Sequence, residues 1–249
     1  MDNFVTMMNK KAKDLGLTST SFVNPYGLDA DGHFSSARDM AIMARELIKH
    51  EIILRYSSIY EEYLNKPDGS NIWMVNTNKL VRFYSGVDGL KTGFTSKAGY
   101  CLTATGKWND MRLISVVMGE ENQTNRTDDT VALLNYGKSS FKLNTILSKD
   151  EVVGEVEIEL GDKIKNDIII MDDVVDLVNV QDDEINYTYD YTTYKLVAPV
   201  KKGEKIGNLN VYYNGKKEMS YYLTVKEDVK KCTIFTLLKR VLSKVILGN

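Results

Sequence analysis

Three consecutive residues, Lys91, Thr92 and Gly93, have chemical groups that suit the binding of a carboxylate. The lysine supplies a fixed positive charge, and the threonine adds a hydroxyl donor. Because glycine has no Cβ, a ligand can come close to the backbone at that position. A tripeptide of this kind also occurs by chance, and alone it could be an exposed turn. Its surroundings favour a binding site, because two glycines precede it and a segment that opens a strand, Ala98-Gly99-Tyr100, follows it.

Other catalytic chemistry has little support in the sequence. The chain has only two histidines and no GxSxG segment, so a Ser-His-Asp hydrolase is not indicated. Its two cysteines, Cys101 and Cys232, are far apart and show no CxxC spacing, so we expect two free thiols and no zinc site. The acidic clusters Asp172-Asp173 and Asp182-Asp183-Glu184 stand in turn-rich sequence, where solvated loops are more usual than metal sites.

The bulk composition is that of an ordinary soluble globular protein, with 43% hydrophobic and 27% charged residues. At 249 residues the chain is long enough for one large domain or two modest ones. The net charge is −2, from 32 basic and 34 acidic residues, so no overall field favours a nucleic-acid partner. We therefore expect no nucleic acid among the ligands.

Helical periodicity is clearest in the first half of the chain. Apolar residues at helical spacing predict a helix at the start, and they are Phe4, Met7, Met8, Ala12 and Leu15. A second helix is predicted over residues 37–48, capped by Ser35 or Ser36. A third is predicted from about Arg126 to Phe141, and the residues expected in its apolar stripe are Val131, Leu133, Leu134 and Tyr136.

Extended segments are predicted in both halves of the chain. In the first half they lie near residues 72–75, 98–105 and 111–118, and a hairpin-like connection joins the last two. From residue 151 onward, apolar and polar residues alternate in short segments, and turns fall about every 8 to 12 residues. This texture is typical of a small all-β sandwich, and it places a domain boundary near residues 143–150.

The tail, residues 230–249, is expected to form an amphipathic helix. On a helical projection its polar arc contains Thr236, Lys239, Arg240, Ser243 and Lys244, and its apolar arc contains Ile234, Leu238, Val241, Leu242 and Val245. The charges interrupt the apolar run too often for a bilayer span. A membrane interface is therefore the favoured partner of this helix, and packing on the protein's own surface is the alternative.

Several spaced motifs, in order along the chain, resemble the serine-type D-Ala-D-Ala carboxypeptidases of the low-molecular-weight penicillin-binding proteins, peptidase family S11. The resemblance covers nearly the whole chain. Its segments are Phe22-Val23-Asn24-Pro25-Tyr26-Gly27-Leu28, residues 33–41, Asn76-Thr77-Asn78-Lys79-Leu80, residues 87–100 and residues 198–207. Such a set is far more specific than the tripeptide at Lys91, and it favours the binding-site interpretation of that lysine.

The resemblance implies an α+β fold. Residues 1–145 would be the C-terminal portion of a serine-β-lactamase-like DD-peptidase domain. Residues 150–227 would be the β-sandwich, and residues 230–249 an amphipathic membrane anchor. The implied location is extracytoplasmic, peripheral to the outer face of the bacterial cytoplasmic membrane.

The resemblance also implies a chemistry, in which a serine removes the terminal D-alanine from peptidoglycan stem pentapeptides through an acyl-enzyme. Lys91, Thr92 and Gly93 would bind the substrate carboxylate, and the backbone N–H of Phe94 would be one oxyanion donor. Arg126 is a further candidate for the carboxylate, although a helix-surface arginine is an equal alternative. β-Lactams would inhibit the intact enzyme, and no metal or organic cofactor is implied.

One departure from the family pattern is serious. The family places its SxxK and SxN motifs upstream of what is the first helix here, and neither motif is present there. The spacing of SxxK occurs only at Ser139-Ser140-Phe141-Lys142, which we interpret as chance. We therefore expect an N-terminally truncated chain that is inactive alone. The alternative functions are a β-lactamase and a non-catalytic module that binds cell-wall or membrane partners.

Overall fold

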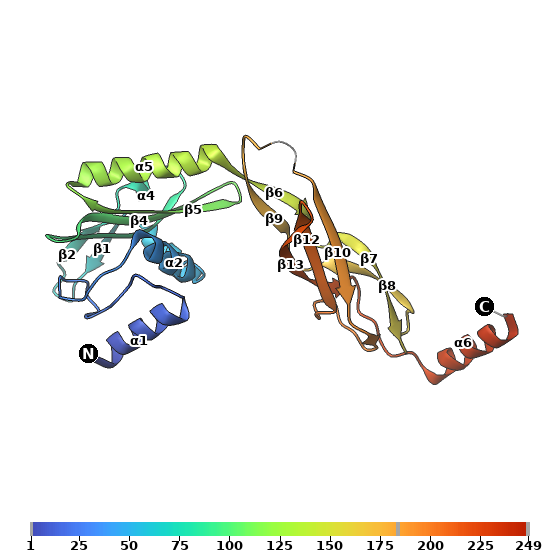
Figure 1. Cartoon of the computed structure of the whole chain (residues 1–249). Helices are drawn as coiled ribbons and strands as arrows, with labels where there is room; N and C mark the ends of the chain where they lie inside the picture. The colour runs from blue at the N-terminus through green and yellow to red at the C-terminus, as the bar shows by residue number, and fades with distance from the viewer. Residues whose placement is uncertain (1, 183–184, 248–249) are drawn as a thin grey trace. The chain divides into compact units, whose positions relative to one another are not determined.

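The computed structural model describes residues 2–182 and 185–247, and in the last helix it describes side chains as far as Leu242. The chain folds as two compact units, Met1–Phe141 and Lys142–Asn249 (Figure 1). Some sequence predictions lie outside the described residues. They concern Asp183 and Glu184 of one acidic cluster, residues 248–249 of the tail, and the side chains of Ser243, Lys244 and Val245.

The first unit is built on a three-stranded antiparallel sheet in the order β3-β4-β5. Its strands are β3 (Val87–Thr95), β4 (Gly99–Trp108) and β5 (Met111–Glu120). The extended segments predicted for β4 and β5 are confirmed. Strand β3 was not predicted, because it carries glycine, lysine and threonine where strands usually carry alternating apolar side chains.

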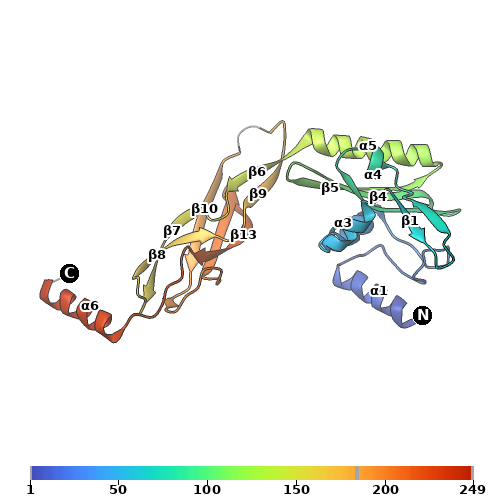
Figure 2. The same cartoon turned by 180° about the vertical axis from the view of Figure 1, so that it is seen from behind.

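Helices pack on both faces of this sheet (Figures 1 and 2). Helix α5 (Gln123–Ser140) covers one face with a core that includes Leu102 and Leu134, and α2 (Ala37–Leu47) packs on the other. Both helices were predicted. The Ser36 hydroxyl caps α2 by accepting from the Asp39 backbone N–H at 3.2 Å, as expected for one of the two serine candidates.

The apolar stripe predicted for α5 is only half right. Leu134 is buried, with 1% of its surface exposed, but Leu133 is 47% exposed and Tyr136 is 61% exposed. The residues that α5 buries are Arg126, Thr130, Leu134 and Gly137. Three of these four are not apolar side chains, so hydrophobic periodicity could not find the buried face.

Five further elements belong to the described part of the first unit. They are α1 (Asp2–Asp14), α3 (Glu51–Ser57), β1 (Glu61–Asn65), β2 (Asn71–Val75) and α4 (Leu80–Phe83). The predictions of a helix at the start and of an extended segment near residues 72–75 are confirmed. Strands β1 and β2 form a two-stranded antiparallel hairpin of their own, in which Tyr63 pairs with Trp73.

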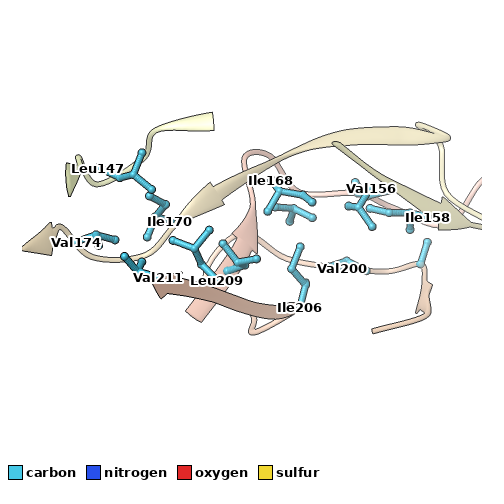
Figure 3. Packing of buried hydrophobic residues seen from close by; sticks show 14 residues of the cluster. Leu147, Val156, Ile158, Ile168, Ile170, Val174, Val200, Ile206, Leu209 and Val211 are labelled. Carbon is cyan, nitrogen blue, oxygen red and sulfur yellow. The ribbon is translucent and has the colours of Figure 1, made fainter. Parts of the chain in front are cut away.

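In the residues that the structure describes, the second unit is all-β apart from its terminal helix, which confirms the predicted class. A six-stranded sheet has the order β10-β12-β13-β8-β7-β11, and β6 pairs with β9 in a two-stranded sheet. The strands are β6 (Phe141–Leu147), β7 (Val152–Glu159), β8 (Lys165–Ile170), β9 (Val174–Asn179), β10 (Tyr187–Thr193), β11 (Leu196–Val197), β12 (Gly207–Tyr213) and β13 (Lys216–Val225). The buried residues of its core are all aliphatic, as Figure 3 shows around Ile168, Ile170 and Leu209, and the partly buried Tyr187, Met219 and Tyr221 pack against them.

The terminal helix, α6 (Ile234–Leu247), is confirmed as a helix. Its Arg240 guanidinium donates to the carbonyl oxygens of Gly161 and Asp162, each at 2.7 Å. Apolar side chains on α6 are exposed, and they are Ile234, Phe235, Leu238, Val241 and Leu242. The half-buried residues of α6 are Thr236, Leu237 and Arg240, so the side that meets the protein's own surface includes polar and apolar residues. None of the helices in the described part of the chain combines the length and the apolar character that crossing a membrane requires.

Candidate functional site

The residues singled out from the sequence meet at one hollow beside strand β3. The hollow has a volume of about 500 Å³, and it is lined by Val75, Asn76, Thr77, Lys79, Lys91, Thr92, Gly93, Phe94, Tyr100, Gln123 and Arg126. All five predicted site residues, from Lys91 to Phe94 together with Arg126, are in this set. Their role toward a ligand stays a prediction.

The start of strand β3, beside the hollow, is held by side chains from other elements. Its Asp88 carboxylate makes a two-pronged ion pair with the Arg112 guanidinium, with N–O distances of 2.9 and 2.8 Å. The Ser57 hydroxyl donates to the Asp88 carbonyl at 2.7 Å. The buried Asn78 amide donates to the Gly89 carbonyl at 3.0 Å. A Cβ at Gly89 would lie 2.6 Å from the Ser57 Oγ, so only glycine fits this approach.

Thr92 is held by a residue that the sequence reasoning gave no role. The hydroxyl oxygens of Thr92 and Thr77 lie 2.6 Å apart. Thr77 stands in a turn that Asn76 stabilises, because the Asn76 amide donates to the carbonyls of Ser57 and Ile59, each at 3.0 Å. The segment from Asn76 to Leu80 was recognised as part of the family resemblance, but nothing in its sequence indicated a contact with Thr92.

Arg126 is a buried arginine with an unsatisfied donor. Only 7% of its surface is exposed, so the alternative of a helix-surface arginine is wrong. Its Nε has no hydrogen-bond partner among the residues that the structure describes. Burial lowers the pKa of the Arg126 guanidinium, since desolvation penalises its charged form. An anionic ligand in the hollow would stabilise the charged form of the Arg126 guanidinium.

The electrostatics of the hollow favour an anion. Lys79, Lys91 and Arg126 are among its lining residues, and that set includes no aspartate or glutamate. The Lys91 Nζ donates to the backbone carbonyl of Thr92, its neighbour in sequence. The lining residues can therefore bind a carboxylate by charge and by hydroxyl and guanidinium donors.

The hydroxyl groups that line the hollow belong to Thr77, Thr92 and Tyr100. None of the residues that line the hollow is a serine, cysteine or histidine. Ser139, the serine of the chance SxxK spacing, stands in the last turn of α5, where its hydroxyl donates to the Tyr136 carbonyl at 3.2 Å. The lining residues that the structure describes can therefore bind and orient an anion.

Both cysteines are free, as predicted. Cys101 lies opposite Gly93 in the β3–β4 register and lines a neighbouring apolar hollow formed with α2. Cys232 belongs to the second unit.

Two family models match the chain in succession. Residues 1–122 match the family described as D-alanyl-D-alanine carboxypeptidase, and residues 141–231 match the C-terminal domain of penicillin-binding protein 5. Among curated relatives, the D-alanyl-D-alanine carboxypeptidase DacF of Bacillus subtilis is 39% identical over 241 residues. The carboxypeptidase DacC of Escherichia coli is 34% identical over 241 residues.

The matches cover almost all of this chain but only part of each relative. They span 96% of the chain and 62% of the Bacillus protein, and 94% of the chain and 58% of the Escherichia protein. A crystal structure of penicillin-binding protein 5 from Haemophilus influenzae is similar, with 34% identity and a TM-score of 0.65. That match covers 92% of this chain and 66% of the other. The chain thus spans about three fifths of the length of the curated relatives.

Proposed function

The chain belongs to the D-alanyl-D-alanine carboxypeptidase family, peptidase family S11, and from this premise we propose that the hollow beside β3 binds the C-terminal carboxylate of a peptide ending in D-Ala-D-Ala. The observation that carries the proposal is the buried Arg126, whose Nε lacks a partner among the described residues. Lys91 and the Thr92 hydroxyl line the same hollow and complete a set of donors for one carboxylate.

In the proposed reaction this hollow supplies binding and orientation. A serine hydroxyl attacks the carbonyl between the two D-alanines, the C–N bond breaks, and the terminal D-alanine leaves with the proton on its nitrogen. Water then hydrolyses the acyl-enzyme. The backbone N–H of Phe94, the residue after Gly93 on β3, would donate to the oxyanion, while Lys91, Thr92 and Arg126 hold the leaving D-alanine by its carboxylate. β-Lactams, which carry a comparable carboxylate, would occupy the same hollow.

We further propose that the 249-residue chain binds this peptide but does not form the acyl-enzyme, because it contains no SxxK or SxN serine in the family's position. The experiment titrates the chain with a peptide ending in D-Ala-D-Ala and with the same peptide as its C-terminal amide, by NMR. In parallel, the chain is incubated with a fluorescent penicillin and denatured before electrophoresis.

The expected result is saturable binding of the acid, binding of the amide at least tenfold weaker, and no covalent penicillin adduct. Equal binding of acid and amide would contradict the carboxylate site. A stable penicillin adduct would show that a nucleophile exists in this chain and that its placement here is wrong.

A location outside the cytoplasmic membrane, with α6 lying in the membrane interface, is the second part of the proposal. Arg240 fixes one side of α6 to the β unit. The exposed apolar side chains of α6 are Ile234, Phe235, Leu238, Val241 and Leu242. An exposed apolar helix face bordered by lysines is the kind of surface that inserts among lipid headgroups.

Sedimentation with anionic phospholipid vesicles tests this part. The full chain is expected to sediment with the vesicles, and the double variant Leu238→Glu, Leu242→Glu is expected to stay in the supernatant. Thr236→Glu adds one negative charge on the polar side of the helix, as each of the two leucine substitutions does on the apolar side, and it serves as the control. Equal sedimentation of all the forms, including a chain without residues 230–249, would disprove the anchor.

A further inference from the structure

The β1–β2 hairpin presents an aromatic pair, Tyr63 and Trp73, that is largely exposed. All ten residues of its two strands are exposed. Tyr63 and Trp73 are directly opposite in the antiparallel register, so their side chains stand on the same face. Each is 59% exposed. Leaving two large aromatic rings side by side in water is costly, and it indicates a binding surface.

The indole ring of Trp73 is held in place from its edge. Its Nε1–H donates to the Glu61 carboxylate at 3.2 Å. The other oxygen of that carboxylate accepts from the Arg82 guanidinium at 3.4 Å, and Arg82 lies over the Tyr60 ring at 5.0 Å. The single donor of the indole is therefore satisfied within the protein, while the ring face stays free to stack on a ligand.

The aromatic pair is continuous with the hollow beside β3. Val75 is two residues beyond Trp73 on β2, so both side chains stand on one face of the hairpin, and Val75 also lines the hollow. Two residues of strand span about 7 Å. A ligand that fills the hollow and extends past Val75 would therefore meet Trp73 and then Tyr63.

We propose that Tyr63 and Trp73 form a saccharide-binding platform, which takes the sugar to which the peptide in the hollow is attached. This inference rests on the proposed function, because a peptidoglycan stem peptide is covalently linked to a glycan strand. A five-residue stem spans at most about 17 Å when extended, so a sugar attached to it can reach the hairpin. Aromatic faces suit the apolar C–H faces of sugar rings, since both are flat and weakly hydrated.

The polar groups beside the rings fit a neutral sugar. Asn65 and Asn71 pair across the strands on the same face as the two aromatic residues, and their amides can exchange hydrogen bonds with hydroxyl and acetamido groups. The charge of Glu61 is compensated by Arg82. The platform thus combines stacking faces with neutral donors and acceptors, whereas a surface for an acidic or basic protein would carry uncompensated charge.

Three ligands test the platform with the full 249-residue chain. They are a stem pentapeptide, the same pentapeptide on its disaccharide, and a peptide-free oligomer of the same sugars. Affinities are measured by calorimetry, and the tryptophan emission is followed. The chain has two tryptophans, and Trp108 is packed against Tyr84 with its Nε1–H donating to the Ser85 carbonyl at 2.8 Å. A change in emission that remains in Trp108→Phe is therefore assigned to Trp73.

The disaccharide-linked peptide is expected to bind about tenfold more tightly than the free peptide, which corresponds to about 1.4 kcal/mol. Trp73→Ala and Tyr63→Ala are expected to remove this difference and to leave the affinity for the free peptide unchanged. Tyr63→Phe keeps the ring, so this variant should retain the difference in affinity between the two peptides. Tyr136→Ala, at an exposed tyrosine on α5, is the control and should retain it as well.

Equal affinities for the free and the sugar-linked peptide would overturn the platform, and so would an equal loss for both ligands in Trp73→Ala. If neither peptide binds, the proposed function fails, and the peptide-free oligomer decides about the platform alone. Binding of that oligomer that Trp73→Ala abolishes supports the platform. The platform is overturned if the oligomer does not bind. It is also overturned if the oligomer binds Trp73→Ala as well as it binds the parent.

Discussion

The hydroxyl oxygens of Thr77 and Thr92 lie 2.6 Å apart at the wall of the hollow beside β3. Each hydroxyl has one proton to donate, so only one of the two can donate within the pair. When Thr77 donates to Thr92, the Thr92 proton remains available for a ligand carboxylate. In that arrangement Thr77 would act as a positioning residue for the Thr92 proton, and the variants below test it.

Replacing Thr77 by valine should weaken peptide binding and leave the fold intact. One hydrogen bond contributes about 0.5 to 1.5 kcal/mol, so the affinity for a D-Ala-D-Ala peptide should fall by a factor of about 2 to 10. Thr77→Ser keeps the hydroxyl and should retain most of the affinity. Calorimetric titration measures both variants. Similar losses in the serine and valine variants would assign Thr77 a packing role instead.

Arg126→Met should separate binding from stability. The Arg126 Nε has no partner among the described residues. Replacing this buried charge by methionine removes its desolvation cost, so the unfolding free energy should stay unchanged or rise by about 1 kcal/mol. The affinity for the peptide should fall at least tenfold, since charged hydrogen bonds contribute about 1.5 to 3 kcal/mol. Urea unfolding and peptide titration give the two quantities. A destabilised variant with unchanged affinity would mean that Arg126 serves the fold.

The two glycines of β3 should respond differently to alanine. A Cβ at Gly93 would come no closer than 4.0 Å to the rest of the protein, at the Cys101 Cβ, so Gly93→Ala should leave the unfolding free energy within about 0.5 kcal/mol of the parent. The added methyl would occupy space beside the strand, and the peptide affinity should fall.

Gly89→Ala is the matched control for the same strand. Its Cβ would lie 2.6 Å from the Ser57 Oγ, so this variant should lose stability. Thermal unfolding followed by circular dichroism ranks the two variants. If Gly93→Ala binds the peptide as well as the parent does, Gly93 is not needed for close approach of a ligand.

The residues that the sequence singles out line one hollow, whereas the contacts that support their strand could not be predicted. Lys91, Thr92 and Gly93 could be recognised because their types suit one chemistry at one spacing. Their strand could not, because β3 is paired on one side by β4 and held at its start by Arg112 and Ser57, which are distant in sequence. Such contacts form only after folding and leave no periodic signal.

Burial on α5 shows the same limit from another side. The helix was predicted, but the buried face includes Arg126, Thr130 and Gly137. At Gly137 the helix packs so closely that a Cβ would lie 2.8 Å from a methyl group of Leu113. The hydroxyl of Thr130 donates to the Arg126 carbonyl at 2.7 Å. Close packing and local hydrogen bonding place these residues inside, whereas hydrophobicity alone would place them outside.

Tyr187 in the second unit should make stability depend on alkaline pH. Burial, together with a 2.7 Å hydrogen bond that its hydroxyl donates to Asp176, raises the pKa of Tyr187 to about 12. A pKa raised in the folded state means that the unfolded chain loses this proton first, near the ordinary value of 10. The contribution to stability is therefore fully present below pH 10 and is lost as the pH rises toward 12.

Tyr187→Phe should isolate this effect from the other tyrosines. At pH 8 the variant is expected to be less stable than the parent by about 1 kcal/mol, because a hydrogen bond is lost. By pH 12 the difference should shrink, since the parent then loses the same bond by ionisation. Urea unfolding at pH 8, 10 and 11.5 measures the difference, and Tyr189→Phe, at an exposed tyrosine two residues away, is the control. A difference that stays constant over this range would mean that the Tyr187 hydroxyl does not ionise with the raised pKa that its contact with Asp176 implies.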